Sequence, residues 1–277
     1  MCSPSTGLRK GLLGLLTCLF SALAWAQTEL PAELAPEVEK RPLHLHPVSR
    51  DYLVSYLTDG RELLLAPWHF DRRQRRNTAF VLGGIGLAMW LDADVKTALM
   101  LKEPPHAWAG YTDPLGNGML LIPLSGVLWL EARLRGNEHG QLTGLNLAKA
   151  GIGARILVQL PKYMFQRHRP GDSPANPFIF EGPFGNYRNN SFPSGHVTTA
   201  FATAAVMRQA YGAEHPWVPV LFYGLGAASA AGRLYQNKHW LSDVLLAAII
   251  GQWVGDFVSL KGSTRFELNG AGVAYKL

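Results

Sequence analysis

Apolar residues recur at helical spacing through most of the sequence, and this pattern constrains the fold more than any other feature. The alternation typical of a strand is weak and is confined to the tail, Thr264–Leu277. Glycine and proline clusters separate the apolar segments and indicate loops. The pattern predicts an all-α bundle of about six core helices and a first helix that precedes them, from segments 49–65, 78–91, 117–135, 142–166, 196–211, 217–233 and 239–259.

The first 26 residues have the three parts of a secretory signal peptide. Arg9 and Lys10 precede an apolar run, 11–23, and Ala24-Trp25-Ala26 gives a small-x-small cleavage site. An uncleaved anchor is the alternative, but the run is shorter than the roughly 20 residues that a membrane span needs. We therefore expect export across the inner membrane and a periplasmic location, either soluble or membrane-associated.

Composition limits the remaining classes of protein. The chain is 48% hydrophobic and 17% charged, which fits a well-buried helical protein or one that contacts a membrane. The apolar runs 79–91 and 119–130 are short for membrane spans, so we expect a bundle with buried helices that rests on a membrane. A net charge of +6, to which the leader contributes Arg9 and Lys10, gives no support to nucleic-acid binding. The sequence leaves the oligomeric state open.

No linker or repeat divides the chain, which favours one main domain. We predict a signal peptide at 1–26, a lead-in and first helix at 27–77, a helical domain at 78–260 and a tail at 261–277. The histidines show no metal-ligand spacing, and we expect neither a metal nor a cofactor. The longest irregular stretch, 170–193, contains five prolines, and a loop of this length inside a domain is usually functional.

Three short polar motifs lie at the ends of predicted helices: Lys162 to Arg169-Pro170, Pro193-Ser194-Gly195-His196, and Gly232-Arg233 followed by His239 and Asp243. Each has a simple structural interpretation. The cations can stabilise a helix C-terminus, Ser194 can cap a helix N-terminus, and His239 and Asp243, four residues apart, can form a surface pair. No single motif establishes a site.

The helix ends that carry these motifs lie on the same side of an up-and-down bundle, so the motifs can converge. Lysine and arginine side chains bind phosphate oxygens, and free N–H groups at a helix N-terminus add to anion binding. One histidine can then attack phosphorus while the other protonates the leaving oxygen. Asp243 can hold the other ring nitrogen of the nucleophile. Positive charge offsets the charge of a phosphoryl-transfer transition state.

The pattern Lys-x6-Arg-Pro, Pro-Ser-Gly-His and Arg-x5-His-x3-Asp over residues 140–258 resembles the type 2 phosphatidic acid phosphatase superfamily, which includes class A acid phosphatases and vanadium haloperoxidases. The resemblance implies an all-helical core with its active site at one end and metal-independent hydrolysis. Gly232 departs from the family pattern, which usually has serine before the arginine. The residue roles that the resemblance implies are a phosphohistidine nucleophile at His239, an orienting Asp243, a general acid at His196, and phosphate ligands at Lys162, Arg169, Ser194, Gly195 and Arg233.

The function expected from this resemblance is an exported phosphatase that acts on phosphomonoesters or diphosphates, with a lipid phosphate or an isoprenoid diphosphate as substrate. The first alternative is a soluble periplasmic acid phosphatase of broad specificity. Two others are a vanadate-dependent haloperoxidase and an envelope protein that binds an anion without catalysis. Because these alternatives share the same motifs, substrate tests are needed to distinguish them.

Overall fold

The computed structural model describes residues 49–100, 108–118, 120–185 and 190–267. The described chain is all-α, as the helical spacing predicts. The predicted signal peptide, most of the lead-in and residues 268–277 of the tail lie outside the described residues. The helices are α2 (Arg50–Leu65), the 3-10 helix η2 (Ala66–His69), α3 (Arg72–Met100), α4 (Trp108–Tyr111), α5 (Asp113–Asn117), α6 (Leu121–Leu134), α7 (Glu138–Leu157), α8 (Gln159–Phe165), α9 (Gly195–Tyr211), α10 (Trp217–Tyr235) and α11 (Leu241–Glu267).

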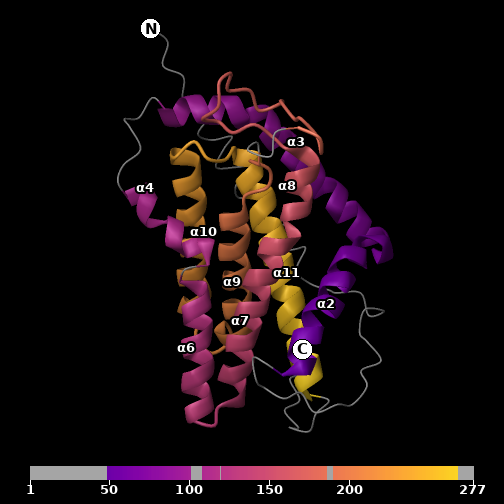
Figure 1. The fold of residues 1–277 in the computed structure, drawn as a ribbon, viewed down its shortest axis with the longest axis vertical. Helices are drawn as coiled ribbons and strands as arrows, with labels where there is room; N and C mark the ends of the chain where they lie inside the picture. Colours follow the sequence, from indigo (N-terminus) through magenta and orange to yellow (C-terminus); the bar gives the residue numbers. More distant parts are fainter. Residues whose placement is uncertain (1–48, 101–107, 119, 186–189, 268–277) are drawn as a thin grey trace.

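Helix α9 is the centre of the bundle. It packs against α7, α10 and α11, and Figure 1 shows these helices running side by side, with α6 beside α7. Val197, Ala202 and Val206 of α9 are almost fully buried. A helix that is apolar on all sides belongs in a core. The hydroxyl of buried Thr198 donates to the carbonyl of Ser194, four residues earlier, so this polar group is satisfied inside the helix.

Helices α9 and α11 run parallel and approach closely because α11 has glycines at the contact. A Cβ atom on Gly251 would lie 2.3 Å from the carbonyl oxygen of Thr198, and one on Gly255 would lie 2.5 Å from that of Ala202. Any larger residue would push the two helices apart. The parallel arrangement brings the N-termini of α9 and α11 to the same end of the bundle.

Helix α3 is longer than the predicted segment 78–91, because it starts at Arg72 and continues to Met100. Its start is a reciprocal capping box: the Gln74 N–H donates to Asp71 Oδ1 at 2.7 Å, and the Asp71 N–H donates to Gln74 Oε1 at 2.9 Å. The basic cluster Arg72–Arg76 therefore forms the first turns of a helix. The predicted domain limit at 77/78 lies inside α3.

The predicted helix 142–166 is two helices, α7 and α8. Helix α7 begins earlier than predicted, after Asn137, whose side chain accepts from the Gly140 N–H at 3.1 Å. It ends at Leu157, and α8 follows from Gln159. Pro161 has no N–H to donate to the carbonyl four residues earlier, and this explains the interruption. Lys162 lies in α8, after this break.

Helix α2 is joined to α7 through a buried ion pair. Lys149 of α7 lies 2.9 Å from Asp59 of α2, and both side chains are almost fully buried. The Lys149 ammonium also lies over the rings of Tyr52 and Tyr56. This pairing explains an ionisable residue in an otherwise apolar segment, because a buried lysine requires a counter-charge.

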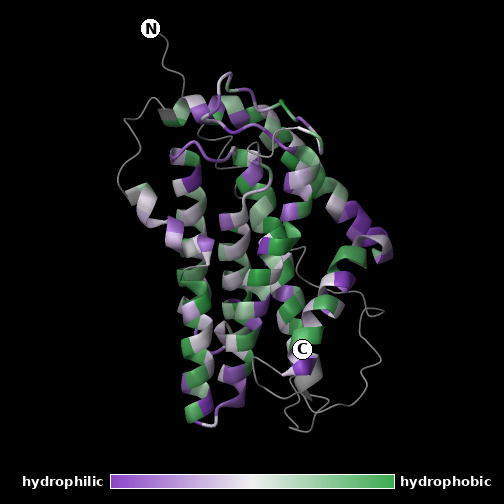
Figure 2. Cartoon of the chain, viewed as in Figure 1, coloured by the Kyte–Doolittle hydropathy of each residue, from purple (hydrophilic) through white to green (hydrophobic). Residues whose placement is uncertain are grey.

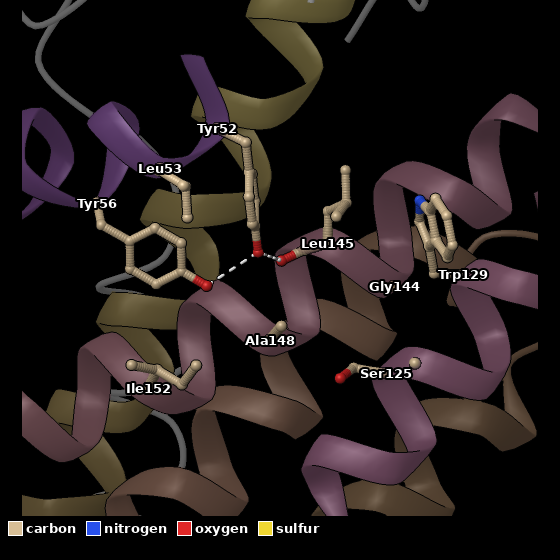
Figure 3. A pocket seen from close by; sticks show the side chains of 10 residues that line it. Tyr52, Leu53, Tyr56, Ser125, Trp129, Gly144, Leu145, Ala148 and Ile152 are labelled. Atoms are coloured by element: carbon tan, nitrogen blue, oxygen red, sulfur yellow. Dashed lines mark hydrogen bonds between the residues drawn. The ribbon is translucent and has the colours of Figure 1, made fainter. Parts of the chain in front are cut away.

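A cavity of about 480 Å³ lies next to this pair, between α2, α6 and α7. Figure 3 shows Tyr52 and Tyr56 on one side of it and Trp129 on the other. The hydroxyl of Tyr52 donates to the carbonyl of Leu145 at 2.8 Å. None of the residues that line the cavity belongs to the three polar motifs.

Two helices, over Arg72–Leu99 and Leu241–Gly262, are long and apolar enough to cross a membrane. Their surroundings in the fold differ. Most of the apolar window of α11 is buried inside the bundle, whereas only 22% of that of α3 is buried. Phe80 and Trp90 of α3 are more than 70% exposed. Figure 2 shows that mainly hydrophobic residues follow the hydrophilic first turns of α3.

Candidate active site

The three polar motifs meet at one end of the bundle, the end that α3 crosses in Figure 1. Ser194 and Gly195 begin α9, Arg233 lies in the last turn of α10, and His239 and Asp243 stand at the start of α11. The Ser194 N–H donates to the Asp243 carbonyl at 3.2 Å, which joins the second motif to the third. Lys162 of α8 and Arg169 of the following loop both bond to Asn190. All eight predicted site residues therefore lie in this region.

His239 is 5% exposed, and its ring is held by the backbone. Nδ1 lies 2.7 Å from the carbonyl oxygen of Ser191. A carbonyl only accepts, so Nδ1 carries the proton and Nε2 keeps its lone pair. This tautomer is the one that a nucleophilic Nε2 requires.

The sequence led us to expect Asp243 to hold this ring nitrogen and to stabilise the cation that forms, and the carboxylate lies beside the ring as its ion-pair partner. Asp243 Oδ2 lies 3.8 Å from His239 Nδ1, beyond hydrogen-bond distance. Asp243 instead accepts hydrogen bonds from the Ser191 hydroxyl and from the Trp240 N–H. It therefore holds the segment whose carbonyl orients His239. A backbone carbonyl therefore accepts the hydrogen bond from Nδ1 that the sequence assigns to Asp243.

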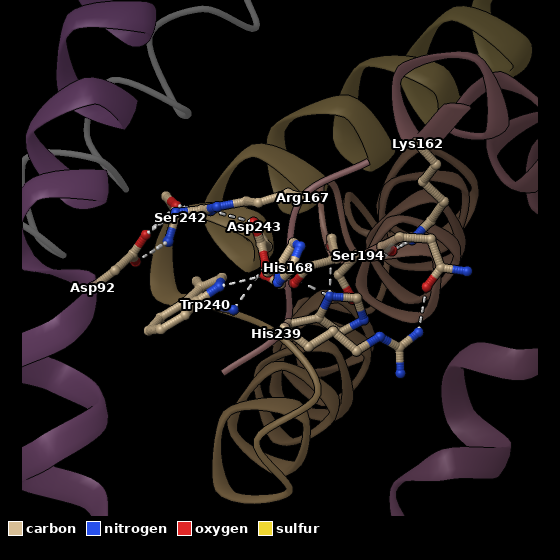
Figure 4. A network of polar contacts seen from close by, with 12 residues as sticks. Asp92, Lys162, Arg167, His168, Ser194, His239, Trp240, Ser242 and Asp243 are labelled. Atoms are coloured by element: carbon tan, nitrogen blue, oxygen red, sulfur yellow. Dashed lines mark hydrogen bonds and ion pairs between the residues drawn. The ribbon is translucent and has the colours of Figure 1, made fainter. Parts of the chain in front are cut away.

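Asp243 belongs to a buried network that sequence reasoning missed (Figure 4). Arg167 donates from Nη1 to Asp243 at 2.5 Å and to the Ser242 hydroxyl at 2.7 Å, and from Nη2 to Asp92 at 2.7 Å. Arg167 lies inside the first motif, but only its ends, Lys162 and Arg169, attracted attention. An aspartate in the apolar part of a helix is a signal that could have identified Asp92.

Cations and unpaired donors face the same region. Lys162 Nζ donates to the Asn190 carbonyl at 2.5 Å, and Arg233 Nη2 donates to Asp113 at 2.6 Å. The Nε atoms of Arg169 and Arg233 and the hydroxyl of Ser194 are buried and make no hydrogen bond to the described residues. Ser194 is therefore not a side-chain cap of α9, its simplest structural interpretation. These donors are suited to an anion with several oxygens.

Arg155 is a further cation that the sequence did not single out. Its guanidinium lies against Gly195, where an added Cβ would be 3.4 Å from Nη1. Its charge contributes to lowering the pKa of both His196 and Lys162. The start of α9 thus has a basic neighbour from α7 in addition to the cations of the motifs.

Burial and positive charge set the protonation of the site. Burial, partly offset by Asp243, lowers the pKa of His239 to about 4. Burial lowers the pKa of Lys162 to about 8. Burial together with Arg233, Arg155, His239 and Lys162 lowers the pKa of His196 to about 3. At neutral pH both histidines are neutral, so His239 is ready to attack, whereas His196 needs a proton before it can act as an acid.

A bound dianion should allow His196 to take up that proton. Its charge opposes the cations that lower the pKa of His196, so the pKa rises on binding. We expect the binding of sulfate, which stays dianionic, to take up as much as one proton at pH 5.5. Calorimetry in buffers of different ionisation enthalpy measures this uptake. His196→Gln should abolish the proton uptake, and His239→Gln should keep it. If the uptake were lost only in His239→Gln, the proton would be bound by His239, and His196 would not be the acid.

The departure at Gly232 has a structural reason. A Cβ atom on Gly232 would lie 2.1 Å from the hydroxyl oxygen of Thr112 and 3.2 Å from the Ala109 carbonyl. The residues after α4 therefore occupy the space that a serine side chain would need. The same contact brings Asp113 to Arg233.

Among the residues that the structure describes, no group of three or more histidine, cysteine, aspartate and glutamate side chains is placed to hold a metal ion.

Comparison with known proteins gives three similarities. A family model described as "PAP2 superfamily" matches residues 143–265. Lipid A 1-phosphatase of Porphyromonas gingivalis is 37% identical over 163 residues, which cover 56% of this chain but only 33% of that protein. Decaprenylphosphoryl-5-phosphoribose phosphatase of Mycobacterium tuberculosis is 30% identical over 151 residues, 53% of this chain and 73% of that protein. No solved structure matches the chain with statistical significance.

Proposed function

This chain belongs to the PAP2 superfamily, and on that basis we propose that it hydrolyses phosphate from a lipid phosphate or an isoprenoid diphosphate. The observation that carries the proposal is the buried His239, with its Nε2 lone pair directed by the Ser191 carbonyl, at a helix end surrounded by Lys162, Arg169 and Arg233. The two relatives are named as phosphatases of lipid-linked phosphates, which supports the same class of substrate.

The reaction has two steps. In the first, Nε2 of His239 attacks phosphorus, a P–N bond forms, and the ester P–O bond breaks as His196 gives its proton to the leaving oxygen. In the second, neutral His196 takes a proton from water, the water oxygen attacks phosphorus, and the P–N bond breaks. Inorganic phosphate leaves, and both histidines return to their starting states.

The remaining site residues bind and stabilise. Lys162, Arg169 and Arg233 offset the negative charge on the transferring phosphoryl group, which is the main requirement of this chemistry. The Ser194 hydroxyl and the N-terminus of α9 at Gly195 add neutral donors. Asp243 acts through Ser191 and balances the positive charge that develops on His239.

A membrane-bound substrate also agrees with α3. Its apolar residues, among them Phe80 and Trp90, are exposed on the described fold. Helix α3 crosses the end of the bundle that carries the site (Figure 1). Covering such a surface with lipid is favourable by roughly 25 cal/mol for each Å² of apolar surface removed from water. We propose membrane association on this basis, with export directed by residues 1–26.

A substrate panel tests the proposal. Full-length protein in detergent is given phosphatidic acid, a prenyl diphosphate and p-nitrophenyl phosphate, and released phosphate is measured. We expect kcat/KM for a lipid substrate to exceed that for the soluble ester by at least about ten-fold, because remote binding energy lowers the barrier. A preference for the soluble ester would indicate the acid phosphatase. Halide oxidation that requires vanadate and peroxide would indicate the haloperoxidase, and tight phosphate binding without turnover would indicate a binding protein.

A further inference from the structure

Arg167 is a fully buried cation that the proposed chemistry does not use directly. Its side chain is 0% exposed, and it is shared between two carboxylates, Asp243 and Asp92. Asp92 is 1% exposed and lies on α3, outside the residues 143–265 that match the family model. The active-site network therefore extends into a part of the chain for which the family match provides no role.

Asp92 also holds the first turn of α11. The Ser242 N–H donates to Asp92 Oδ1 at 2.9 Å, and the Ser242 hydroxyl donates to Asp92 Oδ2 at 2.6 Å. Ser242 lies between His239 and Asp243 in the sequence, in the first turn of α11. One carboxylate thus satisfies a free N–H group at the start of α11, where a negative charge is favourable, and pairs with Arg167 as well.

A continuous path of hydrogen bonds leads from Asp92 to His239. Asp92 fixes the Arg167 guanidinium, and Arg167 Nη1 fixes Asp243. Asp243 accepts from the Ser191 hydroxyl, and the Ser191 N–H donates to the Arg167 carbonyl at 3.1 Å. The Ser191 carbonyl then accepts a hydrogen bond from the Nδ1–H of His239. Each link in this path is a direct contact between buried groups.

Aromatic rings close the surroundings of Arg167. The rings of Phe180, Phe192 and Trp240 lie 5.3, 5.8 and 5.6 Å from the guanidinium carbon. They keep water away from the ion pairs, which strengthens the pairs and leaves little room for water to replace a lost carboxylate. Removal of the Asp92 charge should therefore change how Asp243 is held.

We propose that Asp92 is a positioning residue for the nucleophile: through Arg167, Asp243 and Ser191 it sets the orientation of His239. This inference rests on the proposed phosphatase function. The hydrogen bonds of Asp92 go to Arg167 and Ser242 and not to the cations of the phosphate site or to His196, so it acts on the chemical step and leaves substrate binding unchanged.

The test is Asp92→Asn in the full-length protein, with Asp94→Asn as the matched control, because Asp94 is an exposed aspartate two residues along the same helix. We expect Asp92→Asn to lower kcat by about ten-fold, since a small misplacement of a reacting group is costly. KM and the inhibition constant for inorganic phosphate should change by less than about two-fold, since phosphate binding is unaffected. Rates are normalised to monodisperse, folded protein, and Asp94→Asn should match wild type.

Ser242→Ala provides a second route if Asp92→Asn does not fold. It keeps every charge and the direct Asp92–Arg167 pair, and it removes the hydroxyl that accepts from Arg167 and donates to Asp92. It should lower kcat by roughly three-fold at constant KM. A wild-type kcat in either folded variant would overturn the inference and leave the phosphatase proposal intact. A change in KM or in phosphate affinity would also overturn it, because Asp92 would then shape the binding site. If wild type and Asp94→Asn both release no phosphate, the proposed function fails, and the inference fails with it.

Discussion

His239→Ala should release phosphate at least about a thousand-fold more slowly than wild type, because the group that forms the covalent bond is lost. No phosphoenzyme should form. The measurement uses a substrate labelled with ³²P, a brief incubation, and a quench in base, since P–N bonds hydrolyse in acid. Wild type should retain label at His239, and the variant should retain none.

The matched control is His215→Ala. His215 is exposed and lies between α9 and α10, at the opposite end of α9 from the site. Its removal should leave turnover and labelling unchanged. Label that persists in His239→Ala, together with turnover near the wild-type rate, would show that another residue is the nucleophile and would contradict the mechanism.

His196→Gln should separate substrates by their leaving groups. A lipid alkoxide needs a proton as the P–O bond breaks, so loss of the general acid should slow its release by about a hundred-fold. Nitrophenolate is stable without a proton, and its release in the first step should slow by less than about ten-fold. Because the second step also uses His196, p-nitrophenyl phosphate should give a rapid burst of one equivalent of nitrophenol followed by slow turnover.

Stopped-flow absorbance measures the nitrophenol burst, and a labelled lipid substrate is used to measure the slower reaction of the lipid. His69→Gln is the control, because His69 is exposed in η2 and its ring bonds to the Leu65 carbonyl, away from the site motifs. An equal loss of the first-step rate with both leaving groups would remove the acid role from His196. Its low pKa of about 3 makes this test informative, because the acid form must be created by the bound substrate.

Local signals in the sequence were sufficient for most helices, but not for their limits. Asp71 and Gln74, three residues apart, form the capping box that marks the start of α3 at Arg72, although the apolar periodicity begins only at residue 78. The division of 142–166 was readable from Pro161. The sequence did not indicate that α3 continues beyond residue 91, because these turns are stabilised by contacts with α10 and α11, which are distant in the sequence.

The candidate site was also predictable from the sequence only in part. The sequence by itself determined which residues meet, because the motifs end and begin helices, and alternate helix ends of a bundle share one side. Only the tertiary structure decided how they are held. The Ser191 carbonyl accepts a hydrogen bond from the Nδ1–H of His239, and Asp92, 75 residues before Arg167 in the sequence, shares Arg167 with Asp243. A backbone carbonyl is common to every residue, and a buried ion pair depends on the packing of α3 against α11, so neither leaves a pattern in the sequence that identifies it in advance.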